Sequence, residues 1–487
     1  MKRTSLCVLA VTAACCMLAA CGKTANKDEE YTAPSSEVTA PEPTLPPYEA
    51  NVLTGEEKGD NYPEGQRITA VMVNNITKAR PQRGLSDAQI LFEIKVEGGI
   101  TRFMPVYNDY KDIKEVGPVR SGRDQFFRLI LPWQALYVHE GQSIVMQQYA
   151  IDYEYGNLNN NDGAYGYRDY GRKNYAGQSY NNGTLDLEHT MYTSGENIGK
   201  YIQDNNVDMN RTYNSTFFNF VDYRQDDPVR NIDDGQDAQF VSVTHSDSYK
   251  TRFVYDDATK TYKMQQYYSD GAWRDTIDEG ADNKQLDFTN VLVLYTDIHV
   301  YPGHEAKDLQ YVEYSWGGAG YYCYGGKYQK IYWQKGTPQE ALRLFYLDEN
   351  GQCSETPVEI NIGKSYVAIA DVDEAEKFVA STLDGVDLSK KDSATTEKVI
   401  VEDNAEEGET LGQSTDDLTA GATGAGDAPS STVTTTSSSS QAEAEPTAEP
   451  TAEPTAAPEN TSSSSEQQSS SEEQQPDAPA ENVPAAE

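Results

Sequence analysis

Arginines beside glycines are the residues of this sequence whose types and spacing could do chemistry. Arg120 and Arg123 bracket Ser121 and Gly122, where we expect a helix to begin. Free backbone N–H groups and the helix dipole favour an anion at such a helix start. Two guanidinium groups there would bind phosphate or carboxylate strongly. The spacing therefore predicts an anion-binding site at this point of the chain.

Further candidates for ligand binding stand on expected turns and at strand ends. His139 is the best candidate for proton transfer, because it ends an expected strand and opens a loop, where α/β sheets place ligands. The predicted ligand-binding residues are Asn75, Arg102, Arg120, Ser121, Arg123, His139, Arg168 and Arg172. In the alternative interpretation each arginine pairs with a nearby acid and holds loops together. Acids that could do so are Glu93, Glu97, Asp124 and Asp169.

Two of these acids could also be catalytic. Glu93 and Glu97 share one face of an expected strand, two pleats apart. Carboxylates so placed could flank a glycosidic bond, and a hydrolase of wall polymer would use His139 or Glu97 for acid–base catalysis. Arg102 stands on the expected returning strand between the carboxylates, so a cross-strand salt bridge is the alternative. His189 is either a second site residue or a capping residue.

Tyrosines are concentrated between residues 153 and 182, in a stretch also rich in Asn and Gly. Rings interleaved with amides would suit a glycan of the cell wall. The simpler interpretation is an exposed loop, since long irregular loops are functional or mobile. The tyrosines concerned are Tyr153, Tyr155, Tyr165, Tyr167, Tyr170, Tyr175 and Tyr180.

Standard catalytic signatures are absent from the sequence. No Ser has Gly both two positions before it and two positions after it, so there is no nucleophile elbow. The Gly-Lys-Ser run at 363–365 lacks the glycine that a phosphate loop needs five positions earlier. His139 has Ser143 where a zinc-binding helix would place its second His, and the five histidines make no cluster at ligand spacing. We therefore expect no metal and no cofactor.

The N-terminus predicts where the protein resides. Lys2 and Arg3 precede an apolar stretch at 6–20 that is too short to span a bilayer and has the form of a signal peptide. The following Cys21, directly after Leu-Ala-Ala, resembles the bacterial lipobox, and in that family of signals Cys21 is lipidated. Two acyl chains anchor a protein stably. We expect a bacterial lipoprotein held on the extracytoplasmic face of the cell membrane, and an ordinary signal peptide is the alternative.

Charge limits the partners of this chain. Its 487 residues include 78 acids and 39 bases, and a net charge of -39 argues against nucleic acid as a partner. After Lys398 there is no base and no aromatic residue, and Ala-Glu-Pro-Thr repeats. Such a segment cannot bury enough apolar surface to offset its conformational entropy. We expect a long disordered acidic tail.

Besides the lipidated Cys21, the expected mature chain has two cysteines, Cys323 and Cys353. Outside the cytoplasm they could form a disulfide, or they could stay as unlinked thiols.

Strand and helix patterns alternate in the first half of the folded part. Residues 90–97 alternate between apolar and charged, Gly98-Gly99 is typical of a tight hairpin, and residues 100–107 would return antiparallel. Ser121 and Ser143 are each expected to cap a helix that follows. Alternating strands and helices predict an α/β fold, a mixed sheet with flanking helices.

The second half of the folded part carries strand patterns separated by turns, which predicts a smaller, mainly β domain. The expected organisation is a signal peptide at 1–20, a disordered spacer at 21–64, an α/β domain at 65–239, a mainly β domain at 240–371 and a disordered acidic tail at 372–487.

Several motifs taken together resemble those of the YerB-like lipoproteins, a two-domain family of unknown function. The motifs are Met72-Val73-Asn74-Asn75, Ala79-Arg80-Pro81-Gln82, Glu97-Gly98-Gly99-Ile100-Thr101-Arg102-Phe103 and Gly117-Pro118-Val119-Arg120-Ser121. The resemblance covers about residues 65–371. It implies architecture and location, and it implies no reaction.

Our leading hypothesis is a membrane-anchored lipoprotein that binds an anionic or glycan ligand of the cell envelope, such as a wall glycan or a phosphorylated compound. The rival hypotheses are a cell-wall hydrolase and a protein-interaction scaffold at the cell surface.

Overall fold

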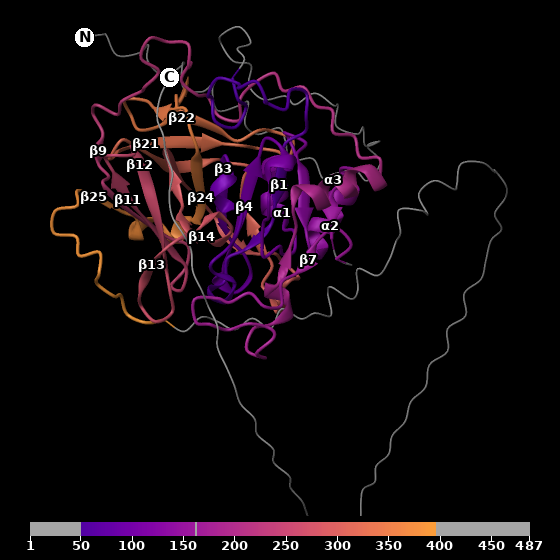
Figure 1. Ribbon diagram of the computed structural model, residues 1–487. Helices are drawn as coiled ribbons and strands as arrows, with labels where there is room; N and C mark the ends of the chain where they lie inside the picture. The colour runs from indigo at the N-terminus through magenta and orange to yellow at the C-terminus, as the bar shows by residue number, and fades with distance from the viewer. Residues whose placement is uncertain (1–49, 161–162, 396–487) are drawn as a thin grey trace, which may run out of the picture. The chain divides into compact units, whose positions relative to one another are not determined.

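A computed structural model describes residues 50–160 and 163–395 of the chain (Figure 1). Cys21, the expected signal peptide and the acidic segment beyond residue 395 lie outside these described residues. Within the described part, no helix has both the length and the apolar character needed to cross a membrane.

The first half of the described chain combines short strands with helices. Its elements are β1 (Thr69–Val71), β2 (Val73–Asn74), β3 (Ile90–Lys95), β4 (Thr101–Tyr107), α1 (Asp124–Ile130), β5 (Leu136–His139), α2 (Ile144–Asp152), β6 (Leu158–Asn159), β7 (Tyr167–Arg168), β8 (Met191–Tyr192) and α3 (Gly195–Asp204).

The second half is mainly β. Its strands are β9 (Gln236–Asp237), β10 (Phe240–Thr244), β11 (Lys250–Asp256), β12 (Thr261–Tyr267), β13 (Trp273–Asp275), β14 (Ile277–Asp278), β15 (Lys284–Gln285), β16 (Asp287–Phe288), β17 (Asn290–Thr296), β18 (Ile298–Val300), β19 (Gln310–Val312), β20 (Gly318–Tyr324), β21 (Lys327–Gln334), β22 (Arg343–Leu347), β23 (Cys353–Pro357), β24 (Ser365–Asp371) and β25 (Val379–Ser381). The predicted fold classes of both halves are confirmed.

One large mixed sheet contains strands from both halves. Its strand order is β23-β22-β21-β20-β17-β24-β3-β4-β1-β5-β6. The halves meet where β24 pairs in parallel with β3, with Tyr366 opposite Leu91 and Ala368 opposite Glu93. The domain boundary that we expected near residue 239 therefore divides the sequence, but the segments on either side of it contribute strands to the same sheet.

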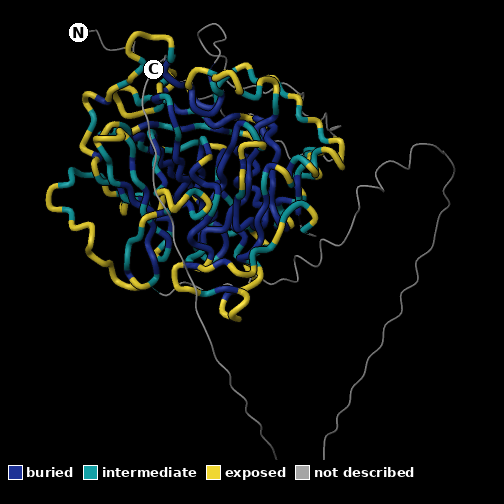
Figure 2. Tube along the Cα trace, viewed as in Figure 1, coloured by how far each residue is buried: buried dark blue, intermediate teal, exposed yellow. Residues whose placement is uncertain are grey.

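The alternation of side chains along β3 divides the core into two layers. Ile90, Phe92 and Ile94 pack with Phe126 and Phe127 of α1 on one face of the sheet. Leu91, on the opposite face, belongs to a second cluster that includes apolar residues of β10, β11 and β12. Those strands belong to the second sheet, of order β13-β12-β11-β10-β25. Figure 2 shows the buried strands at the centre and the exposed loops around them.

Short-range sequence patterns predicted several elements correctly. The β3–β4 hairpin pairs Lys95 with Thr101 around the two glycines, and Ser143 caps α2 by accepting a hydrogen bond from the Met146 N–H at 3.1 Å. The prediction that Ser121 caps a helix is wrong. The structure begins α1 at Asp124, and no side chain caps it.

The folded body extends beyond both predicted limits. Within the expected spacer, Leu53 is fully buried and the Val52 carbonyl accepts a hydrogen bond from the Phe217 N–H. Beyond residue 371, β25 pairs antiparallel with β10, and the Phe378 ring stacks on that of Tyr321 at 4.1 Å between centroids. The predicted tail therefore starts too early, because the pattern of a short edge strand resembles that of a polar linker.

A buried carboxylate connects the two halves. Glu93 of β3 accepts hydrogen bonds from Thr101 at 2.8 Å, from Thr251 at 2.8 Å and from Tyr366 at 2.6 Å. The His245 Nε2 atom lies 3.6 Å from the same carboxylate. Burial disfavours the charged form, but His245 and the hydroxyl donors hold the pKa of Glu93 at about 2.

We expect Glu93→Gln to destabilise the fold by about 3 kcal/mol, because the amide cannot accept all of the hydrogen bonds that reach the carboxylate. The folded-state pKa is lowered, so this contribution is present above pH about 4.5 and is lost as pH falls towards 2. Urea unfolding at several pH values should show the difference between wild type and variant shrinking below pH 4.5. Glu355→Gln, at an exposed position of β23, is the matched control and should change stability by less than about 0.5 kcal/mol. An equal effect of both variants would contradict a central role for Glu93.

We expect truncation after residue 371 to lower the melting temperature by at least about 4 °C, since it removes β25 and the Phe378 contact. Truncation after residue 395 keeps every contact described above and serves as the control. Differential scanning calorimetry of both proteins checks this, and equal melting temperatures would show that residues 372–395 are dispensable for the fold.

Candidate functional site

Three of the predicted arginines lie close together and are buried. Arg102, Arg120 and Arg123 are 0%, 3% and 8% exposed. Burial and the neighbouring charge of Arg123 lower the pKa of Arg102. Glu97 lies among these side chains, with its Oε1 atom 2.5 Å from the Arg123 Nε atom. Burial opposes ionisation of Glu97, but Arg123 and Arg102 hold its pKa below the ordinary value.

The other ligand-binding candidates have protein partners as well. The Arg120 guanidinium lies 3.1 Å from the Glu188 carboxylate, and Arg168 lies 2.5 Å from Glu140. Arg172 donates to the backbone carbonyls of residues 79 and 81, each at 3.0 Å. The Ser121 carbonyl accepts a hydrogen bond from Arg102. This geometry favours the interpretation in which the arginines hold loops together.

His139 is fully buried at the end of β5. Its Nδ1 atom lies 2.7 Å from the Gly141 carbonyl and its Nε2 atom 2.9 Å from the Asn157 amide oxygen. Burial lowers the pKa of this imidazole to about 4. A neutral imidazole carries one N–H, so the ring donates to one of these two oxygens, and its buried position at the end of β5 orders the 139–142 loop.

Glu93 and Glu97 belong to separate networks. Glu93 faces the second half of the chain, as described above, and Asn75 donates to it at 3.0 Å. The Asn75 amide oxygen in turn accepts from Arg80, Gln82 and Gln266. Glu97 faces Arg123 instead. The structure gives both carboxylates protein partners, so their arrangement does not resemble a pair that flanks a sugar bond.

His189 forms part of the acidic group Asp186, Glu188 and His189, whose ligand atoms lie within 4.8 Å of one another. The Asn74 amide nitrogen lies 3.1 Å from the His189 Nδ1 atom. The amide is oriented this way because its oxygen accepts from a backbone N–H at 3.1 Å. In a neutral ring, Nδ1 then accepts and Nε2 carries the proton.

This tautomer matters because a protonated Nε2 atom cannot bind a metal. The Nε2 atom lies 3.2 Å from the Glu188 carboxylate. Lys78 lies 3.1 Å from Asp186, and Arg120 also reaches Glu188. The group therefore has the geometry of a neutralised surface cluster rather than of a metal centre.

The two cysteines are separate thiols. Cys323 lies on β20 and Cys353 on β23, with β21 and β22 between them in the sheet. The possible disulfide is therefore not formed, because sheet order separates residues whose sequence spacing would have allowed it.

The tyrosines of the 153–182 stretch pair with other rings. Tyr170 and Tyr180 lie 5.1 Å apart between centroids, Tyr165 lies 5.1 Å from Tyr201, and each member of the first pair is more than 40% exposed. Tyr170 and Tyr180 thus form an exposed aromatic pair, whereas Tyr153 and Tyr155 pack against the core, and the relation of these tyrosines to a ligand stays a prediction.

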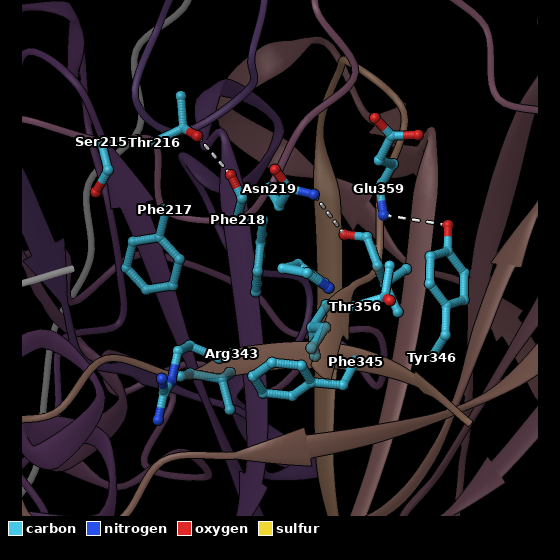
Figure 3. Close-up of a pocket in the computed structure, with 14 residues that line it drawn as sticks. Ser215, Thr216, Phe217, Phe218, Asn219, Arg343, Phe345, Tyr346, Thr356 and Glu359 are labelled. Carbon is cyan, nitrogen blue, oxygen red and sulfur yellow. Dashed lines mark hydrogen bonds between the residues drawn. The ribbon is translucent and has the colours of Figure 1, made fainter. Parts of the chain in front are cut away.

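A hollow elsewhere on the surface has the form of a binding site. It encloses about 390 Å³, within the usual range for ligand sites, and we call it the Phe217 groove. Residues 215–219, 342–346 and 356–359 line it. Figure 3 shows the rings of Phe217, Phe218 and Phe345 gathered around the same space.

The Phe217 groove has an apolar floor and polar edges. Phe217 and Phe218 are only 3% and 4% exposed, and Phe217 stacks on Trp133 at 4.6 Å, so the floor is fixed by the core. Phe345 and Tyr346 of β22 are half-buried and form the wall. Few polar groups around an apolar floor are typical of a small-molecule or oligosaccharide site.

Sequence reasoning missed this groove. Its floor comes from the aromatic run at 217–220, which has neither the period of a strand nor that of a helix. Its wall comes from a strand more than 120 residues later in the chain. The unusual density of Phe in a polar segment was the one signal available.

Comparison with known proteins identifies both halves of the chain. The model of a family described as a protein of unknown function (DUF3048), N-terminal domain, matches residues 53–208, and that of its C-terminal domain matches residues 241–367. These matches confirm the resemblance that the motifs predicted.

YerB of Bacillus subtilis resembles this chain both in sequence and in structure. The protein "Putative lipoprotein YerB" of Bacillus subtilis (strain 168) is 44% identical over 91 residues, which cover 19% of this chain and 27% of that protein. The match thus spans about a quarter of the relative's length. The crystal structure of the YerB protein from Bacillus subtilis has a TM-score of 0.54 and 22% identity, covering 68% of this chain and 99% of that chain. The shared fold, and the two domain matches in the same order along one chain, show that this protein belongs to the two-domain DUF3048 family, whose function is unknown.

Proposed function

We propose that this protein is an extracytoplasmic lipoprotein, anchored to the membrane through Cys21, that binds a glycan of the cell envelope in the Phe217 groove. The observation that carries the binding proposal is the hollow itself, with its aromatic floor and polar edges. The lipobox-like sequence and the name of the Bacillus subtilis relative, a putative lipoprotein, support the anchor.

A glycan suits this groove for physical reasons. Sugar rings have apolar faces and polar edges, and aromatic side chains offer flat surfaces for such faces. Asn219 stands at the edge beside the rings (Figure 3), where its amide N–H donates to the Val358 carbonyl at 3.4 Å. The oxygen of the same amide can accept a hydrogen bond from a sugar hydroxyl.

The anchor is tested directly by Cys21→Ser. We expect the wild-type protein, expressed in a bacterium, to incorporate a labelled fatty acid and to sediment with membranes, because the thiol carries the acyl groups. The variant should lose both properties while Cys7→Ser keeps them. Acyl labelling of Cys21→Ser equal to wild type would refute the anchor.

Binding is tested by titrating the full chain with cell-wall glycan strands in a calorimeter. We expect saturable binding that Phe345→Ala weakens at least tenfold, about 1.4 kcal/mol, because the variant loses a wall of the groove. Trp316→Ala is the matched control, since Trp316 is 78% exposed and does not line the groove.

The control should bind as wild type does, and both variants should keep the wild-type melting temperature within a few degrees. Absence of saturable binding to wild type, or equal binding by Phe345→Ala, would refute the groove as a glycan site.

A further inference from the structure

We propose that the ligand of the Phe217 groove is an anionic glycan, one that carries carboxylate or phosphate groups, and that Arg343 binds its negative charge. This inference rests on the proposed function and narrows the class of ligand. It is drawn from the hydrogen-bonding state of two side chains in the groove.

Arg343 is a guanidinium with no protein partner for its charge. It begins β22, is half-buried in the groove lining, and lies over the Phe345 ring at 5.7 Å. Among the residues that the structure describes, no carboxylate lies within 4.0 Å of it and no acceptor receives its N–H groups. Five donors fixed in one plane are therefore left for a ligand.

The contrast with the predicted site is informative. Arg120, Arg123 and Arg168 each reach a carboxylate of the protein, and all three were expected from sequence to bind a ligand. Arg343 was not expected to do so, yet its side chain lines a hollow and lacks such a partner. A planar guanidinium matches carboxylate and phosphate oxygens in pairs.

Tyr346 supplies a second donor at the other end of the groove (Figure 3). Its hydroxyl oxygen accepts hydrogen bonds from the Arg230 Nε atom at 3.0 Å and from the Glu359 N–H at 3.3 Å. Within the described part of the chain, no acceptor receives the hydroxyl proton. That proton is fixed in direction by the two incoming bonds and can be donated to a sugar or acid oxygen.

The acidic character of the chain does not oppose this assignment at short range. Glu359 lines the groove, but Figure 3 shows its carboxylate directed away from the rings of Phe217, Phe218 and Phe345, and it makes no ion pair with Arg343. The net charge of -39 acts over longer distances. Charges more than about 8 Å away are largely screened at physiological ionic strength.

The test compares charged and neutral forms of one ligand on the full chain. The probes are a glycan oligosaccharide with free carboxylates and its methyl ester, and a sugar-phosphate polymer and its dephosphorylated form. Calorimetry should show that at least one acidic form binds tenfold or more tightly than its neutral partner. The pair that shows the preference identifies carboxylate or phosphate as the group that is bound.

Variants assign the preference to a residue. Arg343→Gln should abolish the preference and leave the affinity for the neutral form unchanged, whereas Arg343→Lys should retain part of it. The control is Arg224→Gln, an exposed arginine that lies outside the groove and pairs with Asp222. It should keep the full preference.

The outcomes separate this inference from the proposed function. Equal binding of the acidic and neutral forms, or a preference that survives Arg343→Gln, would overturn the anionic assignment while the glycan site stands. Absence of binding by all four probes would overturn both. Because the Arg343 guanidinium, unlike its backbone, makes no hydrogen bond within the described part of the chain, an unchanged melting temperature of Arg343→Gln confirms that the comparison reports on binding.

Discussion

The buried carboxylate of Glu93 is the constraint on which the arrangement of this protein depends. A charge without access to water is tolerated only where donors surround it. Here the donors come from both halves of the chain, Thr101 from the first and Thr251 and Tyr366 from the second. Glu93 itself lies on β3, the strand that pairs in parallel with β24 of the second half. The two halves are thereby joined through β3, β24 and the hydroxyl donors around Glu93.

The joining of the two halves explains the position of the Phe217 groove. The floor residues Phe217 and Phe218 belong to the core cluster that also contains Phe92 of β3. The wall residues stand on β22, next to the edge strand β23 of the large sheet. A floor that is part of the packed core is ordered before a ligand arrives, which lowers the entropic cost of binding.

Sequence predicted the local features of this fold and missed the long-range ones. The β3–β4 hairpin and the Ser143 cap were predictable, because alternation and capping act over a few residues. The start of α1 was missed, since the Ser121 carbonyl is engaged by Arg102 from a different strand. Glu97, the partner of Arg123, was among the acids that the sequence offered, whereas Glu140 and Glu188, the partners of Arg168 and Arg120, were not, because those pairs depend on how distant segments pack. For the same reason Arg343, which sequence reasoning did not select, is the guanidinium that the groove presents.

The partners of the arginines show how an acidic chain uses its guanidinium groups. In this acidic chain, buried guanidinium groups are held by the protein itself, Arg120 and Arg123 by carboxylates and Arg172 by backbone carbonyls. Clusters of arginine in such a sequence therefore indicate structural networks as readily as ligand sites. The arginine that remains without an acceptor carries more functional information than the several that have one.

The central claim is that ligands enter the Phe217 groove rather than the arginine cluster around Glu97. Nuclear magnetic resonance of the full chain, recorded while a cell-wall glycan is added, tests it most directly. The account predicts that backbone amide signals of residues 215–219, 342–346 and 356–359 shift while those of 120–123 and 139–142 stay in place. Shifts confined to 120–123 and 139–142 would contradict it.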